Sequence, residues 1–231
     1  MILKDKVVIV TGASEGVGRA IAERLAHEGA KLALVARSEE KLRKVAEMVG
    51  GEAFVCDVRD RAQVQAAISA VVAKFGGIDV LINNAGIWQK PSQLDELPDQ
   101  TVDDVLATSL TGTIFATKYA LPHLKRREAE TAILQIVSKS GVTAQEGQSV
   151  YTASKWGVKG FTDVLRADLK GSNVRVGAVY QSGTNTDMFR KAGDEFDQAK
   201  LTEPADLADA VAYMLTRPPK MWVPELHVAY W

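Results

Sequence analysis

The chain of 231 residues is poor in the features that mark secreted, membrane-bound and nucleic-acid-binding proteins. It has one cysteine, Cys56, so no internal disulfide can form, and we expect this thiol to be buried. Its 28 basic and 29 acidic residues nearly cancel, which leaves no net field for nucleic acid or an anionic membrane. No apolar run approaches the roughly 20 residues that cross a bilayer, and no apolar leader precedes the first short apolar block. We therefore expect a cytoplasmic protein without nucleic-acid or membrane partners.

Histidine is scarce as well. The three histidines, His27, His123 and His227, lie far apart in the sequence and follow no metal-ligand or triad spacing. We therefore expect no metal site. The remaining composition, with 46% hydrophobic and 25% charged residues, is that of an ordinary globular protein and excludes a disordered or collagen-like chain.

Short β-branched blocks alternate along the chain with longer stretches whose apolar residues recur at helical spacing. Strands are expected near 7–10, 31–36, 53–57, 79–82, 132–138, 174–180 and 223–229, and helices near 17–28, 39–49, 61–75, 102–126, 150–170 and 203–216. This alternation predicts an α/β fold of one domain over residues 1–231: a Rossmann-like, doubly wound parallel sheet of about seven strands with helices on both faces. The stretch 183–200 follows neither pattern, and a loop of that length predicts a substrate loop or lid.

A glycine-rich turn, TGASEGVG over residues 11–18, follows the first expected strand and precedes an amphipathic helix. Glycines at such a turn let the backbone approach a pyrophosphate, and the start of the helix offers free N–H groups to it. Alone the signal is weak, because about a third of such turns are only tight connections and the spacing departs from the common dinucleotide fingerprint.

Three further features follow in order along the chain. Asp57 comes just after the third expected strand, Asn-Asn-Ala-Gly occupies 83–86 after the fourth, and Tyr151 and Lys155 open a later helix, with Ser138 thirteen positions before Tyr151. Together with the glycine turn they resemble the short-chain dehydrogenase/reductase family over nearly the whole chain. The resemblance implies an oxidoreductase that moves hydride between a nicotinamide nucleotide and a small carbonyl or secondary alcohol.

The resemblance also implies which residues hold the nucleotide. The pyrophosphate turn would use Gly12, Ser14, Gly16 and Val17, with Glu15 beside them; the adenine would meet Asp57 and Val58; the ribose side would be flanked by Asn83, Ala85 and Gly86; and the carboxamide would be held by Thr184 and Thr186. A simple turn is the alternative interpretation of Asn83 and its neighbour.

The end of the second strand indicates which nucleotide is used. An acid there would bind a ribose 2′-hydroxyl, whereas this chain has Arg37 and Ser38, which suit a 2′-phosphate. The family resemblance therefore implies that NADP(H) is preferred and NAD(H) possible. Glu15 weakens that preference, because relatives that use NADP(H) often have a basic residue at this position. A solvated charge at a strand end is the alternative for Arg37.

Tyr151 and Lys155 are four residues apart and therefore share one helix face. A tyrosine hydroxyl has a reference pKa near 10, and a nearby ammonium group should lower the pKa of Tyr151 toward acid–base work at neutral pH. By resemblance, Lys155 also binds the nicotinamide ribose and Ser138 hydrogen-bonds the reacting oxygen. A helix-surface pair and a turn serine are the structural alternatives.

Two positions depart from the family pattern. Ser109 stands where the family has an asparagine that helps to hold a water linked to the lysine, so Ser109 replaces it as the candidate in the proton relay. Gln181-Ser182 stands where a Pro-Gly pair is usual. These departures motivate the alternative of a nucleotide-binding sensor or scaffold with weak or no turnover.

Aromatic and apolar residues predict two further surfaces. Candidates for the pocket rim, at least half of which could be core, are Trp88, Tyr180, Met188, Phe189 and Phe196. The resemblance implies a homodimer or homotetramer built on the helices near 102–126 and 150–170. An interface there could use five residues, each of which could equally belong to the core: Phe115, Tyr119, Trp156, Phe161 and Leu165.

Overall fold

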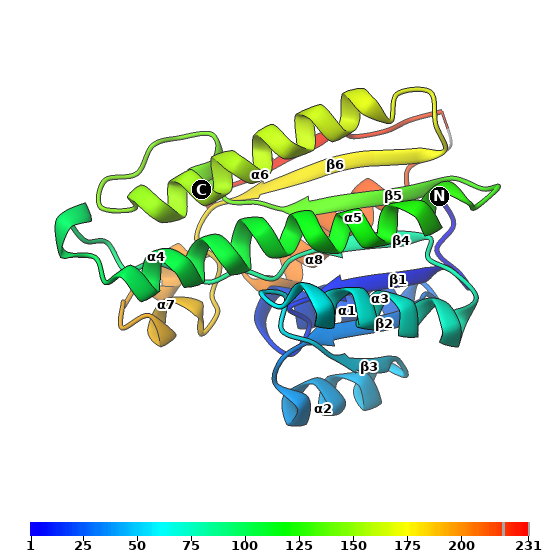
Figure 1. Cartoon of the computed structure of the whole chain (residues 1–231), viewed down its shortest axis with the longest axis horizontal. Coiled ribbons are helices and arrows are strands. Elements are labelled where there is room, and N and C mark those ends of the chain that lie inside the picture. The colour runs from blue at the N-terminus through cyan, green and yellow to red at the C-terminus, as the bar shows by residue number, and fades with distance from the viewer. Residues whose placement is uncertain (219, 231) are drawn as a thin grey trace.

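The computed structural model describes residues 1–218 and 220–230 (Figure 1). Its strands are β1 (Val7–Thr11), β2 (Lys31–Ala36), β3 (Glu52–Val55), β4 (Val80–Asn83), β5 (Thr131–Ile136), β6 (Val174–Gln181) and β7 (Glu225–Val228). Its helices are α1 (Gly16–His27), α2 (Glu39–Val49), α3 (Arg61–Phe75), α4 (Asp99–Leu106), α5 (Gly112–Lys125), α6 (Ser149–Asp168), α7 (Met188–Lys191) and α8 (Pro204–Leu215).

The strands form one parallel sheet of seven strands in the order β3-β2-β1-β4-β5-β6-β7. The chain winds outward from the centre in one direction through β2 and β3 and then returns to wind in the other from β4 to β7. Val10 of β1 therefore pairs with Leu34 on one side and with Ile82 on the other. The predicted Rossmann-like, doubly wound sheet is confirmed. Its strand order reverses between β1 and β4, which is where open parallel sheets bind ligands.

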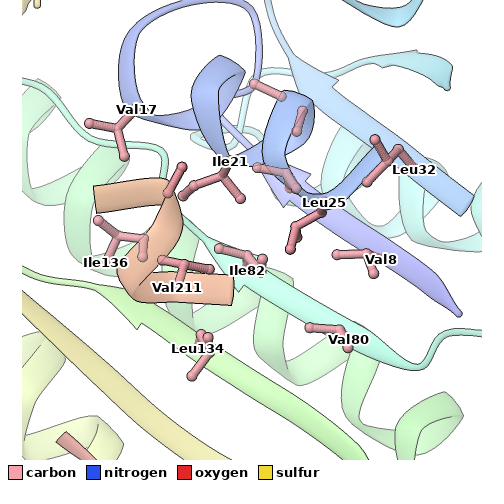
Figure 2. Packing of buried hydrophobic residues seen from close by; sticks show 14 of the residues in the cluster. Val8, Val17, Ile21, Leu25, Leu32, Val80, Ile82, Leu134, Ile136 and Val211 are labelled. Atoms are coloured by element: carbon pink, nitrogen blue, oxygen red, sulfur yellow. The ribbon is translucent and has the colours of Figure 1, made fainter. Parts of the chain in front are cut away.

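Helices cover both faces of the sheet because alternate strand residues point to opposite sides. Val8 and Val10 belong to the cluster packed against α1, α2 and α8, whereas Val7 and Ile9 belong to the cluster packed against α3, α5 and α6. Figure 2 shows the first cluster, in which Val211 of α8 lies among side chains of α1 and the sheet. Strands buried on both sides read as continuous apolar runs, which is why the sequence located them.

The long helix expected over 102–126 is interrupted. α4 and α5 are joined by a π-helical turn, Ala107–Thr111, which contains Ser109. Close packing accompanies the interruption: a Cβ on Gly112 would lie 3.0 Å from Val58, and the Thr113 hydroxyl donates to the Ser109 carbonyl at 3.1 Å. Such turns carry one extra residue, which an apolar period of 3.6 does not reveal.

The segment 183–200, expected to be irregular, contains the short helix α7 and a 3₁₀ turn at Gln198–Lys200. It is anchored to the start of α8 by a backbone bridge between Thr184 and Thr202. Figure 1 places α7 and α4 at the same end of the molecule, the end toward which the β1 and β5 arrows point. The segment therefore lies at the edge of the sheet where a ligand would bind.

Candidate active site

A cavity of about 850 Å³ opens at the carboxyl edge of the sheet. Residues at or just after the ends of β1 to β6 line it, together with part of the segment 183–200. Of the residues singled out in the sequence, its wall contains Gly12, Ser14, Glu15, Gly16, Val17, Arg37, Asp57, Val58, Ala85, Gly86, Ser138, Tyr151, Lys155, Thr184 and Thr186. The structure thus brings together groups that are up to 174 positions apart in the sequence, from Gly12 to Thr186 (186 − 12).

The glycine turn can accept an anion. Gly12 and Gly16 have φ of 66° and 55°, a region that favours glycine, and a Cβ on Gly12 would lie 2.9 Å from the Ala85 Cα. α1 then begins with Glu15 at its cap position, but the Glu15 side chain makes no capping hydrogen bond, and the first turn holds no acid. The first N–H groups of α1 are therefore left for a ligand, and the helix dipole favours a negative one.

At the end of the cavity away from the glycine turn, which we call the chemical end, Ser138, Tyr151 and Lys155 lie close together. Tyr151 and Lys155 lie in the first two turns of α6 and are only 6% and 5% exposed. The Lys155 ammonium lies 5.6 Å from the centre of the Tyr151 ring and donates to the Ile136 carbonyl at 3.4 Å. Ser138 follows β5, hydrogen-bonds the Tyr151 side chain and accepts from the Ser140 N–H at 3.1 Å. A hydroxyl pair and a buried ammonium thus face one cavity.

Burial controls the ionisation of this group. It raises the pKa of Tyr151 to about 12, although the hydrogen bond from Ser138 opposes the shift. It lowers the pKa of Lys155 to about 8. The expectation that the pKa of Tyr151 is lowered is therefore wrong, because desolvation by burial is the larger cause and the Ser138 hydrogen bond offsets it only in part. At neutral pH, Tyr151 holds its proton and Lys155 holds its charge.

The sequence profile of the short chain dehydrogenase family matches residues 6–197. That match spans most of the chain and includes the glycine turn, Ser138, Tyr151 and Lys155. The chain belongs to the short-chain dehydrogenase family.

Proteins similar to this short-chain dehydrogenase are named as dehydrogenases and reductases. D-threitol dehydrogenase of Mycolicibacterium smegmatis is 38% identical over 197 residues, which cover 83% of this chain and 75% of that protein. The alcohol dehydrogenase of Thermococcus sibiricus, solved with 5-hydroxy-NADP, has a TM-score of 0.89 at 27% identity and covers 98% and 97% of the two chains. The 3-ketoacyl-(acyl-carrier-protein) reductase of Brucella melitensis, solved with NADH, has a TM-score of 0.89 at 30% identity and the same coverage. This short-chain dehydrogenase is accordingly an oxidoreductase of CH–OH and C=O groups.

Three of the predicted site residues are not part of the cavity wall. Ser38 is the cap residue of α2, next to Arg37. Asn83 is buried and its amide donates to the Thr117 hydroxyl at 2.9 Å, so it ties β4 to α5 instead of facing the cavity. Ser109 is 1% exposed, and its hydroxyl accepts from the Ile87 N–H at 3.4 Å. A Cβ on Gly86 would lie 3.5 Å from both the Ser109 hydroxyl and the Lys155 ammonium, so Gly86 lies beside both groups.

Glu15, the residue that weakens the expected NADP(H) preference, does not present a free negative charge. Its carboxylate accepts from the Lys41 ammonium of α2 at 2.8 Å and from the Lys191 ammonium of α7. The two lysines neutralise the acid and also tie α7 to the glycine turn. These partners are 26 and 176 positions away in the sequence, so no local pattern reveals them.

The aromatic rim of this short-chain dehydrogenase is largely as expected. Trp88, Met188, Phe189 and Phe196 line the cavity. Tyr180, for which the sequence left rim and core open, belongs to the core. It is 1% exposed, packs with Val137, Val158 and Ala178, and stacks on His227 at 4.7 Å between ring centres. Alternation along β6 directs position 180 into the core under α6.

Sequence reasoning missed Gln89, a fully buried glutamine in the loop after β4. Its side-chain carbonyl accepts from the backbone N–H groups of Val150 and Tyr151, at 3.1 and 2.8 Å. A glutamine in a loop carries no periodic or motif signal, and its partners are about sixty residues away.

Other chemistries have little support in the part of the chain that the structure describes. Across residues 1–218 and 220–230, no group of three or more His, Cys, Asp or Glu side chains could hold a metal ion. Within the same residues, no helix is long and apolar enough to cross a membrane. Cys56 is buried as expected, and burial raises the pKa of its thiol to about 11.

Proposed function

We propose that this short-chain dehydrogenase transfers hydride between NADP(H) and a small carbonyl compound or secondary alcohol, with Tyr151 as the acid–base group. The observation that carries the proposal is the shared cavity: the buried cluster of Ser138, Tyr151 and Lys155 opens into the same space as the glycine turn. A nucleotide along the turn and a small substrate at the cluster fit a cavity of about 850 Å³.

The residues present fit a nicotinamide nucleotide. The uncapped start of α1 suits its pyrophosphate, and Arg37 at the end of β2 suits a 2′-phosphate. Lys41 and Lys191 neutralise Glu15, which removes the strongest local argument against that phosphate. NAD(H) remains a usable second cofactor because the turn itself does not distinguish the two. When bound, the nicotinamide supplies or accepts the hydride.

The chain's own residues handle the proton. Ser138 donates a hydrogen bond to the substrate oxygen, which gains negative charge during reduction. Tyr151 then gives its proton to that oxygen, and in the reverse direction it receives one. Lys155 stabilises the phenolate that forms. Because burial keeps the pKa of Tyr151 near 12, the tyrosine starts protonated at neutral pH, which favours carbonyl reduction.

The test is oxidation of NADPH over a panel of ketones and aldehydes, followed by absorbance. The second candidate is a nucleotide sensor or scaffold, which Ser109 and Gln181-Ser182 motivate. Under that alternative NADPH binds, no carbonyl is reduced and changes at Tyr151 have no effect. Reduction of any member of the panel, abolished in Tyr151→Phe, supports the enzyme.

Cofactor choice has its own prediction. Arg37→Asp should weaken NADPH binding by about one to two decades and leave NADH binding nearly unchanged, because a charge-assisted hydrogen bond contributes roughly 1.5 to 3 kcal/mol. Fluorescence titration of both nucleotides measures it. Equal losses for the two, or tighter binding of NADH by the unaltered protein, would contradict the preference.

A further inference from the structure

Three aromatic side chains form a continuous wall beside Tyr151. The Trp88 ring meets the Tyr151 ring edge-on, with centres 4.8 Å apart, and meets Phe189 in the same way at 4.9 Å. Phe196 lies 4.4 Å from Phe189 and 6.1 Å from Trp88. All three line the cavity. We call Trp88, Phe189 and Phe196 the aromatic wall.

The aromatic wall presents the faces and edges of its rings to a ligand and has no free hydrogen-bonding group. The single polar group in it, the Trp88 indole N–H, already donates to the Asp194 carboxylate at 3.0 Å. Phe196 is 44% exposed, so a large apolar ring in the cavity is left partly in water. Covering such a ring with another flat apolar group releases that water and adds ring–ring contact.

The other groups near the reacting position are mainly uncharged. Ser140 and Gln148 are buried and hydrogen-bond each other at 3.3 Å, and Gln145 completes that part of the wall. Two cations lie at this end, the buried Lys155 beside Tyr151 and the exposed Lys139, whereas Arg37 lies at the nucleotide end. Because the Lys155 charge is needed to stabilise the Tyr151 phenolate, an anionic substrate would depend on the solvated Lys139, while an apolar one would meet the whole aromatic wall.

We propose that the preferred substrate is an uncharged carbonyl compound, or the matching alcohol, that bears an aryl ring or a similar flat apolar group next to the reacting carbon. This inference rests on the proposed function, and it adds the class of substrate. The wall begins at the tyrosine itself, so a ring bound against it sits directly beside the carbonyl oxygen held by Ser138 and Tyr151.

The test compares kcat/KM for an aryl methyl ketone, a straight-chain ketone of equal carbon number and an aryl keto acid. We expect the aryl ketone to be preferred over both by about tenfold or more, and Phe196→Leu to reduce that preference about three- to tenfold. Phe75→Leu, which removes the same ring atoms from α3 outside the cavity, is the matched control and should leave the preference unchanged. Equal values for aryl and alkyl ketones, or a preference for the keto acid through Lys139, would overturn the inference and leave the proposed function standing.

Binding provides a readout that does not need turnover. Calorimetric titration of the aryl ketone into the protein with NADP⁺ should show binding that Phe196→Leu weakens and Phe75→Leu does not. If no carbonyl is reduced but this pattern holds, the proposed function fails and the aromatic wall is still a binding site. If the aryl ketone binds no better than the alkyl ketone, the substrate class is wrong.

A different observation carries a second inference, which concerns Gln89. Its side-chain carbonyl accepts from the N–H groups of Val150 and Tyr151, and its amide donates to the Gly147 carbonyl at 3.0 Å. The cap residue of α6, Gln148, makes no capping hydrogen bond with its own side chain. Gln89 therefore satisfies the first-turn donors of α6 that would otherwise be unpaired in a buried place.

The geometry assigns Gln89 as a positioning residue for Tyr151. Gln89 holds the tyrosine backbone at 2.8 Å while its neighbour Trp88 packs against the tyrosine ring. The consecutive residues Trp88 and Gln89 thus hold the ring and the backbone of Tyr151, respectively. A displacement of about 1 Å at a reacting group can cost a hundredfold in rate, so this support bears on kcat.

Gln89→Met and Gln89→Glu separate positioning from mere stability. Gln89→Met removes all three hydrogen bonds at similar volume, and kcat should fall about ten- to a hundredfold while the NADPH Kd is unchanged. Gln89→Glu keeps the acceptor, so much of kcat should return. Its carboxylate also disfavours the phenolate, so the basic limb of the pH–rate profile should move to higher pH. Gln93→Met, in an exposed place on the same loop, is the control.

Two results would overturn this assignment. One is full kcat in Gln89→Met. The other is a loss of kcat that follows the loss of folded protein in both variants, with no rescue and no movement of the pH profile in Gln89→Glu. A purely structural glutamine would give the second result.

Discussion

Tyr151 is almost fully buried, and yet the proposed mechanism requires it to exchange a proton. Burial raises its pKa to about 12, and the Ser138 hydroxyl is the group that partly offsets this shift. Tyr151 is therefore protonated at neutral pH. In the proposed mechanism, the negative charge that appears when it gives up its proton is balanced by Lys155, whose ammonium lies 5.6 Å from the ring centre.

Tyr151→Phe removes the exchangeable proton and keeps the ring that packs on Trp88. We expect turnover to fall about a hundred- to ten-thousand-fold, as is usual for general acid–base groups, while NADPH binding persists. Steady-state rates and a fluorescence titration on the same preparation measure both. Unchanged turnover on a substrate that the unaltered protein reduces would show that another group supplies the proton.

Lys155 should destabilise the fold at neutral pH. It is charged at pH 7 in the folded and unfolded chain, and the lowering of its pKa from 10.5 to about 8 corresponds to roughly 3 kcal/mol of burial cost. Lys155→Met should therefore raise the free energy of unfolding by up to that amount. Between pH 8 and 10.5, Lys155 keeps its proton in the unfolded chain but has lost it in the folded protein. The free energy of unfolding of the unaltered protein therefore rises with pH across this range, and the extra stability of Lys155→Met becomes smaller. Urea unfolding at pH 7 and pH 10 measures the difference; an advantage that stays constant with pH would contradict it.

Among the elements, α7 and the chain around it are held to the rest of the cavity wall by side-chain contacts at two separate places. At the nucleotide end Lys191 pairs with Glu15, and at the chemical end Asp194 accepts from Trp88. The segment 183–200 was expected to be a substrate loop, and these two contacts are consistent with the lid that we propose. If this segment is a lid, its opening breaks both contacts.

Glu15→Gln should loosen one of those contacts. We expect NADH to dissociate about two- to fivefold faster, the range that partly exposed ion pairs provide. NADH is the suitable probe because it lacks the 2′-phosphate, whose attraction would also change. Lys191→Met should have a similar effect, and the two changes together should not add, since they remove one interaction. Glu40→Gln, whose ion pair with Lys44 lies on the outer side of α2, is the control; an equal effect there would refute the lid contact.

Local patterns in the sequence located most helices and strands of this fold, but not the turn between α4 and α5 or the side-chain contacts between distant segments. Buried strands such as β4 are continuous apolar runs, and the helices show a stripe of apolar residues, so both were found to within a few residues. The π-helical turn at Ser109 was missed because its one extra residue leaves no mark in an apolar period of 3.6, and the close packing beside it involves Val58, far away in the sequence. Gln89 and the partners of Glu15 were missed for the same reason. Motif residues identified the glycine turn, Ser138, Tyr151 and Lys155, whereas burial alone determined the pKa of Tyr151, and burial is a property of the folded chain.

The outer surface of α6 carries exposed apolar side chains that suit an interface between two copies of the chain. Trp156 and Val164 on this helix are 48% and 61% exposed, and on neighbouring α5 the Phe115 and Tyr119 rings stack at 6.1 Å. α5 and α6 run along the same face of the molecule (Figure 1). Leu165, for which the sequence left interface and core open, is part of the core. We propose that this face pairs with a second copy about a two-fold axis.

Light scattering at micromolar concentration should therefore give a mass two or four times 25.0 kDa. The double change Trp156→Asp and Val164→Asp should shift the mass toward the single chain, because two charges would be buried without partners. Met48→Asp, an equally exposed apolar position on α2, is the control and should not change the mass. A mass of 25.0 kDa for the unaltered protein would exclude this assembly.

The single thiol of the chain gives the molecule a built-in reporter. Cys56 is 1% exposed at the end of β3, and a pKa of about 11 leaves little thiolate at neutral pH. A thiol reagent can therefore modify it quickly only when that edge of the sheet opens. Because the chain has no other cysteine, the labelling rate of the native protein measures this one opening event, and a bound nucleotide that holds the edge closed would slow the labelling.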